Sequence, residues 1–329
     1  MARRPRLRPR PTVSREDPDI RRWWENLAQG SRVTADVRLR SLSLFCRLMR
    51  LRPQGLASME PSRLRDLLLD YVPGERKRGQ AGSSTATHLK AVKSWLLHHD
   101  VKIDLPVKVR DAQKAPTLAD ERVPSQDEWR AVLKDATPRN RVICALMAFS
   151  GVRPQVLGNY LGADGLRLKD LPELRIGKEQ VAFAHSPTLV VVRPELSKAR
   201  PGYLTFLGEE GCGYVREYLA ERLAQGEALG PETDPIHARN VDKSFIRALN
   251  VSDAVRTAFQ DGGLTGQRPY VLRSFFASQV LIAESQGKVA NDPADLRPYS
   301  TRFNALFTPG AMHYDSAACA GTGFSCFQM

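Results

Sequence analysis

Cysteine is scarce in this sequence. Five of its 329 residues are cysteines, and no two of them form a CxxC pair. A disulfide framework and a zinc ribbon both need paired cysteines, so neither is indicated. Unpaired thiols are compatible with a reducing compartment. The sequence therefore predicts a cytoplasmic protein.

Long hydrophobic runs are absent. The longest, Val142 to Phe149, has eight residues, whereas a membrane-spanning helix needs about 20. The N-terminus carries several arginines, and no apolar segment follows them as it would in a secretory signal peptide. We therefore expect no membrane partner.

Motifs for nucleotide and metal chemistry are also missing. There is no GxxxxGK[ST], no GxGxxG after a strand, no HExxH, no GxSxG and no Asp/Glu group spaced like a two-metal nuclease. His98 and His99 close an expected helix. Adjacent helix residues face different directions, so we expect a pair of surface histidines and no metal ligands there. Any chemistry is then expected to need no metal and no cofactor.

Positive charge is in excess. Lys and Arg number 49 against 36 Asp and Glu, which gives a net charge of +13, and the pI is about 9.8. Hydrophobic residues make up 42%, which is enough to bury a core. This balance favours a polyanionic partner such as nucleic acid, although a basic protein without such a partner would also have it.

The composition divides the chain into five segments. Residues 1–14 form a basic tail expected to be disordered, which either grasps phosphates or has no specific role. Residues 15–100 have helical apolar spacing, and 101–122 read as a basic linker with two prolines. Residues 123–290 form a second domain, and 291–329 are a divergent C-terminal segment.

The first domain is expected to be helical throughout. Helices are predicted over residues 34–50, over residues 62–71 and from Thr85 onward. The Pro73-Gly74 pair is expected to stop the second of these helices and to open a polar loop up to Ser84.

The second domain is expected to combine helices with a small antiparallel sheet. Ser125 and Glu128 have the spacing of a capping box at a helix start. Two β-branched or aromatic runs, 188–192 and 203–207, predict strands joined by a polar turn. Helical patterns resume at residues 211–223, 241–249, 252–259 and 272–283. The fold class is therefore mainly α with a small antiparallel sheet: a helical N-terminal domain plus an α+β domain.

Basic residues stand at the ends of these elements. Arg153 lies in Ser150-Gly151-Val152-Arg153-Pro154, Lys198 lies in the turn between the strands, and Arg273 lies in Tyr270-Val271-Leu272-Arg273. Two guanidiniums can bind the oxygens of one phosphate, and a turn lysine can protonate a leaving oxygen. Taken singly, each has a plainer explanation: a surface or ion-paired arginine, a solvated lysine and a packed tyrosine.

In this order the three segments resemble the tyrosine recombinase (phage integrase) family. Ser150–Pro154 resembles its first-arginine box, and Glu195-Leu196-Ser197-Lys198 resembles its hairpin lysine segment. Tyr270–Arg273 resembles its His-x-x-Arg box, with Tyr in the place of His as in archaeal integrases. The resemblance spans about residues 15–290. It implies a core-binding domain at 15–100 and a catalytic domain at 123–290.

The resemblance implies site-specific recombination of duplex DNA through a 3′-phosphotyrosyl intermediate, as in the integrases of mobile elements. Arg153 and Arg273 would stabilise the phosphorane, Lys198 would protonate the 5′ oxygen, and Tyr270 would donate a hydrogen bond to the phosphate. It also implies a homotetramer on paired sites, associated with the nucleoid. The alternatives are a type IB topoisomerase, a catalytically dead DNA-binding relative and a basic structural protein.

The C-terminal segment departs from the family pattern. Only Tyr299 and Tyr314 follow Arg273, at offsets of 26 and 41, the first short and the second long for the family nucleophile. No Lys or Arg occurs in the 27 residues after Arg302, where 49 in 329 predicts about four. Either a frameshift or mis-called end has replaced the nucleophile segment, or a lineage-specific tail supplies Tyr314. Of the two tyrosines, Tyr314 is the predicted nucleophile, because Pro309-Gly310 provides a hinge before it.

Overall fold

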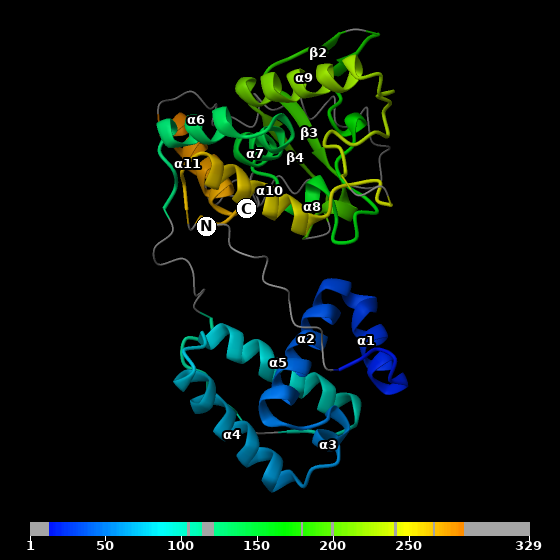
Figure 1. Cartoon of the computed structure of the whole chain (residues 1–329), viewed down its shortest axis with the longest axis vertical. Coiled ribbons are helices and arrows are strands. Elements are labelled where there is room, and N and C mark those ends of the chain that lie inside the picture. The colour runs from blue at the N-terminus through cyan, green and yellow to red at the C-terminus, as the bar shows by residue number, and fades with distance from the viewer. Residues whose placement is uncertain are drawn as a thin grey trace, which may run out of the picture. The chain divides into compact units, whose positions relative to one another are not determined.

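The computed structural model describes residues 13–103, 106–113, 122–178, 180–198, 201–239, 242–265 and 267–285, with residues 283–285 described as backbone only. The described residues up to Gln113 form one compact unit, and those from Arg122 onward form a second (Figure 1). Each unit has its own hydrophobic core.

The first unit is a helical domain, as predicted. Its helices are α1 (Pro18–Gly30), α2 (Arg32–Met49), α3 (Pro53–Ala57), α4 (Pro61–Lys77) and α5 (Gly82–His98) (Figure 1). The carboxylate of Asp17 caps α1 by accepting hydrogen bonds from two backbone N–H groups of its first turn. The core is rich in large rings, and Trp23 packs edge-on against Trp95, with ring centroids 5.5 Å apart.

The prediction that Pro73-Gly74 stops a helix is wrong. Helix α4 continues through Pro73 to Lys77, and the chain turns at Gly79, whose φ is 71°. Proline removes one backbone hydrogen bond, but the next turn contributes buried contacts. Glu75 is 1% exposed and pairs with Arg78. These contacts compensate for the lost backbone bond.

Part of the segment expected as a linker packs on the first unit. Val101, Ile103, Val107 and Val109 are partly buried against its core. Lys102, Lys108 and Arg110, next to these apolar residues, are exposed. This stretch therefore contributes packing that its proline and charge content obscured.

The second unit is built around helix α7 (Pro138–Ser150), almost all of whose apolar residues are buried. Helices α9, α10 and α11 and strand β4 contact it. The capping box of Ser125 and Glu128 is present at the start of α6, as predicted. The helices are α6 (Gln126–Asp135), α7, α8 (Pro154–Leu157), α9 (Glu209–Ala224), α10 (Ala248–Asp261) and α11 (Val271–Ser285), with 3-10 turns η1 (Leu168–Asp170) and η2 (Pro194–Leu196) (Figure 1).

The predicted strand pair is confirmed. Strands β3 (Thr188–Val192) and β4 (Tyr203–Leu207) pair antiparallel, with Val192 opposite Tyr203. A second hairpin, β1 (Leu174–Ile176) with β2 (Val181–Phe183), had no clear sequence signal because each of its strands has three residues. The expected fold class, mainly helical with little antiparallel sheet, is confirmed.

The helix expected over residues 241–249 is wrong in most of its length. Residues 242–247 are irregular, and α10 begins at Ala248. The apolar residues of this segment, Phe245 and Ile246, are buried from a loop. They mimic helical spacing without forming a helix.

The sequence predicted that the chain has no membrane-spanning helix. Within the part of the chain that the structure describes, no helix combines the length and the hydropathy that crossing a bilayer requires.

Candidate functional site

The turn between α7 and α8 has an unusual backbone. Gly151 ends α7 in the left-handed region, with φ of 65°, and its N–H donates to the carbonyl of Met147 at 3.1 Å. From strand β4, the Thr205 hydroxyl donates to the carbonyl of Ser150 at 2.8 Å. This buried contact fixes the direction in which the chain leaves α7 toward Arg153.

Arg273 links the first turn of α11 to the same loop. Its Nε donates a hydrogen bond to the carbonyl of Gly151 at 2.7 Å. The ring of Phe276, one turn further along α11, lies where a side chain on Gly151 would be. The bond uses Nε. The side chain also hydrogen-bonds that of Tyr270, and the remaining N–H groups of the guanidinium can bind an anion. Helix α11 is therefore locked onto the loop that carries Arg153.

The two sequence-predicted arginines come close together. Burial, and next the charge of Arg153, lower the pKa of the Arg273 guanidinium. Both side chains are half-buried. Two neighbouring, half-buried cations attract an anion, because an anion offsets their mutual repulsion.

Tyr270 stands beside this pair. Its side chain is exposed, and the guanidinium carbon of Arg273 lies 5.9 Å from the centre of its ring. This is within the range of a cation–π contact. The hydroxyl is thus accessible to a ligand bound by the arginines.

Tyr203 is a residue of this cluster that the sequence did not indicate. It is the first residue of β4 and is half-buried. Burial raises the pKa of its hydroxyl, against the charges of Arg273 and Arg153, which lower it. The hydroxyl therefore keeps its proton at neutral pH and can donate a hydrogen bond. Its position at a strand start carries no motif, so only the pairing of β3 with β4 reveals it.

Lys198 lies in the turn after β3 and is exposed. The start of that turn is anchored by Arg193, which donates to Asp164 at 2.8 Å and to Asp170 at 3.2 Å. No contact among the described residues joins Lys198 to Arg153 or Arg273. Tyr299 and Tyr314, the two tyrosines considered as nucleophile, lie outside the described residues.

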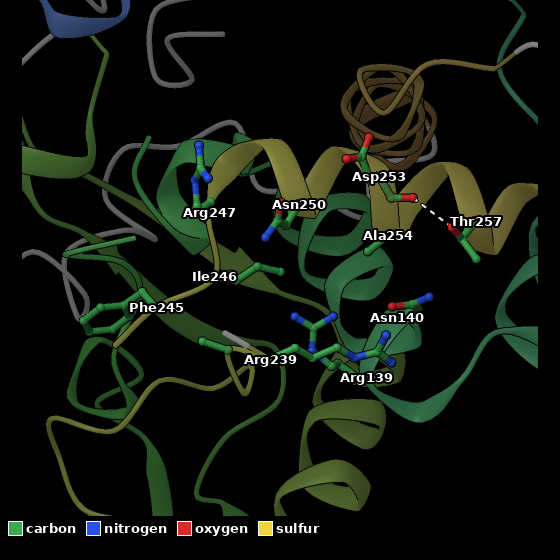
Figure 2. A pocket seen from close by; sticks show the side chains of 11 residues that line it. Arg139, Asn140, Arg239, Phe245, Ile246, Arg247, Asn250, Asp253, Ala254 and Thr257 are labelled. Atoms are coloured by element: carbon green, nitrogen blue, oxygen red, sulfur yellow. Dashed lines mark hydrogen bonds between the residues drawn. The ribbon is translucent and has the colours of Figure 1, made fainter. Parts of the chain in front are cut away.

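A second cluster of cations lines a cleft of about 300 Å³ in the same unit. Figure 2 shows Arg139 and Arg239 side by side at the cleft, with Arg247 at its other edge. Burial, and next the charge of Arg239, lower the pKa of Arg139. Within the described ranges none of these three arginines has a carboxylate ion-pair partner. Asn140 and Asn250 also line the cleft, as does one acidic residue, Asp253, so the arginines give the lining an excess of positive charge.

In the first unit, His98 and His99 do not face different directions, as their adjacency in the sequence had predicted. The Nε2 of His98 and the Nε2 of His99 both point at the carboxylate of Asp19, at 3.3 and 3.1 Å. The helix ends at His98, so the next residue departs from helical geometry and its ring reaches the same partner. This is a group of described residues with the donor types for a metal ion.

Comparisons with known proteins give structural similarity alone. No protein family model matches the chain, and no curated protein sequence matches it. The structure of the XerA recombinase aligns with a TM-score of 0.36 and 19% identity, over 88% of this chain and 98% of that one. The integrase from mycobacterium phage Brujita aligns with a TM-score of 0.33 and 16% identity, over 81% and 79%.

A third solved structure is the XerH site-specific recombinase bound to a palindromic difH substrate, in a post-cleavage complex. It aligns with a TM-score of 0.47 and 14% identity, over 87% of this chain and 82% of that one. All three solved structures are of proteins named as recombinases or integrases.

Proposed function

We propose that this protein is a site-specific DNA recombinase of the tyrosine recombinase type, with residues 15–100 as its core-binding domain and residues 123–290 as its catalytic domain. The observation that carries the proposal is the hydrogen bond from Arg273 to the loop of Arg153. It joins the first turn of α11, which carries Arg273, to the loop that carries Arg153, so that both guanidiniums can serve a single phosphate.

The roles proposed for these residues are those that the family resemblance implies, with Tyr203 added from the structure. Arg153 and Arg273 bind the non-bridging oxygens and stabilise the charge that develops on phosphorus. Tyr270 and Tyr203 donate hydrogen bonds to the same phosphate. Lys198, on its exposed turn, protonates the leaving 5′ oxygen when DNA is bound. A tyrosine hydroxyl attacks phosphorus and forms the 3′-phosphotyrosyl bond, which conserves the energy of the broken phosphodiester.

The arginine-lined cleft supplies a second contact to the DNA backbone. Arg139, Arg239 and Arg247 bind phosphates away from the reacting one, and so contribute affinity without taking part in the chemistry. Together with the net charge of +13, this gives binding with a steep dependence on salt. If six to ten phosphates are neutralised, affinity falls by about 10³–10⁵ between 50 and 200 mM salt. A flat salt response in a gel-shift titration would contradict the proposal.

The decisive experiment traps the covalent intermediate. A nicked suicide duplex lets the cleaved strand diffuse away, so the phosphotyrosyl complex accumulates and the DNA-bearing peptide can be mapped. We expect DNA on the peptide containing Tyr314. DNA on Tyr299 would move the nucleophile there and retain the recombinase proposal.

The second candidate is a DNA-binding relative without a nucleophile. It is favoured by one observation, the change of composition after Arg302. Intact DNA binding with no covalent complex would establish it in place of the recombinase. A covalent complex that relaxes supercoiled DNA as a monomer, without paired sites, would instead indicate a topoisomerase. A homotetramer on paired sites is the assembly expected of the recombinase.

A further inference from the structure

The contact between α1 and the end of α5 contains an N/N/O donor set. Asp19 lies in the first turn of α1, while His98 ends α5 and His99 follows it. One ligand atom from each residue can be chosen so that all three lie within 4.8 Å of one another. The side chains of Asp19, His98 and His99 are partly exposed, at 32%, 23% and 26%.

The distances match those between ligands of one ion. In a tetrahedral site with bonds of about 2.0–2.1 Å, neighbouring ligand atoms lie about 3.3–3.4 Å apart. The Nε2 of His98 is 3.3 Å from Oδ1 of Asp19, and the Nε2 of His99 is 3.1 Å from Oδ2. These two distances run to different oxygens of the carboxylate, and with one oxygen chosen, all three ligand atoms lie within 4.8 Å of one another. A small closure of the three side chains would place them around one ion.

One of the two nitrogens lies near the carboxylate without a hydrogen bond to it. His98 makes a hydrogen bond with Asp19, but the Nε2 of His99 is buried and has no hydrogen-bond partner among the described residues, despite the nearby carboxylate. A buried polar atom without a partner is costly. Binding to a cation satisfies this lone pair.

The rings of His98 and His99 pack against Trp95. Trp95 is fully buried, and its Nε1 donates to the carbonyl of Pro53 at 2.8 Å. The ring centres of His99 and His98 lie 4.4 and 5.7 Å from that of Trp95. This packing limits the motion of both rings, so less side-chain entropy is lost on binding an ion.

We propose that Asp19, His98 and His99 form a transition-metal site, with Zn²⁺ as the ion and water as its fourth ligand. Imidazole and carboxylate donors suit Zn²⁺. The bound ion joins the first turn of α1 to the end of α5, two segments 79 positions apart. It stabilises the first unit and is separate from the arginine cluster of the second unit.

The test uses the full chain after removal of metals with a chelator. Titration calorimetry with Zn²⁺ is expected to give one saturable site per chain, and Co²⁺ is expected to give the visible absorption bands of tetrahedral coordination. The midpoint of thermal unfolding should rise with Zn²⁺ concentration, because the ion binds the folded state. Absence of saturable binding would overturn the proposal.

Variants locate the ion. Asp19→Asn and the double variant His98→Ala/His99→Ala should each weaken Zn²⁺ binding by about 10-fold to 100-fold or more. Changes to residues that only support a metal ligand already cost that much. His185→Ala removes an exposed histidine of the second unit and should bind like the parent. Circular dichroism checks folding, and His99→Gln replaces the double variant if that one unfolds. Unchanged affinity in the variants would place the ion elsewhere and refute the site.

Discussion

Arg273 and Gly151 are 122 positions apart, and the Nε of the first donates to the carbonyl of the second at 2.7 Å. The bond gives Arg273 two functions. It fixes the loop between α7 and α8, and it orients the remaining N–H groups of the guanidinium beside Arg153. Removing the arginine therefore has a structural and a functional consequence, which the following variants separate.

Arg153→Ala and Arg273→Ala should each lower the rate of strand cleavage by about 10²–10³, the usual cost of removing one preorganised donor. Only Arg273→Ala should also lower the free energy of unfolding, by about 1–3 kcal/mol, because the Gly151 carbonyl loses its partner. Single-turnover cleavage of a nicked duplex and chemical denaturation measure the two effects. Arg130→Ala, which removes an exposed arginine paired with Asp127, serves as the control and should change neither. Parent-like cleavage by Arg153→Ala would exclude that residue from the site.

Gly151→Ala should destabilise the second unit by about 1–3 kcal/mol. Its φ of 65° is strained for any other residue, and the added methyl group would overlap the ring of Phe276. Gly213→Ala is the matched control. This glycine lies within α9 with open space around it, so the same change should stabilise by roughly 0.5–1 kcal/mol. Equal effects of the two changes in urea denaturation would argue against the strained loop.

Tyr203→Phe should reduce cleavage about tenfold while leaving DNA affinity close to that of the parent. The change removes one neutral hydrogen-bond donor to the phosphate and retains the ring that packs at the start of β4. Tyr214→Phe, on α9, is the control: that hydroxyl donates to Glu210 at 3.0 Å, so cleavage should be unaffected. Equal rates for both variants would remove Tyr203 from the cluster.

His88 should make the first unit less stable in mild acid. Burial lowers the pKa of His88 below its ordinary value, against the charge of Glu75, which raises it. Its Nδ1 lies 2.7 Å from the hydroxyl of Tyr71. Because the folded state holds the imidazole neutral, the unfolded state binds more protons as the pH falls through about 6.5. The free energy of unfolding should decrease from there down to the folded pKa.

To test this prediction, the free energies of unfolding of the parent protein and of His88→Gln are measured by urea denaturation at several pH values. The difference between their unfolding free energies should shrink as the pH falls below about 6.5, because only the parent has to protonate a buried imidazole. A constant difference across that range would show that His88 titrates alike in both states.

The sequence by itself determined the broad organisation and part of the site. Apolar spacing predicted α2, most of α4 and most of α5 but not α1 or α3. β-branched runs predicted β3 and β4, and the motif order singled out Arg153 and Arg273. These signals are local, because periodicity and capping depend on residues within a few positions. Where local rules conflicted with packing, they failed: α4 runs through Pro73 because Glu75 is buried beyond it.

Only the tertiary structure decided which distant residues meet. The pairing of β3 with β4 fixes Tyr203 in the arginine cluster, and the bond from α11 to Gly151 sets how Arg273 faces Arg153. The meeting of Asp19 with His98 and His99 depends on how α1 packs against the end of α5, which adjacency in the sequence had argued against. Such contacts depend on burial and side-chain fit across tens of residues, and no local pattern encodes them.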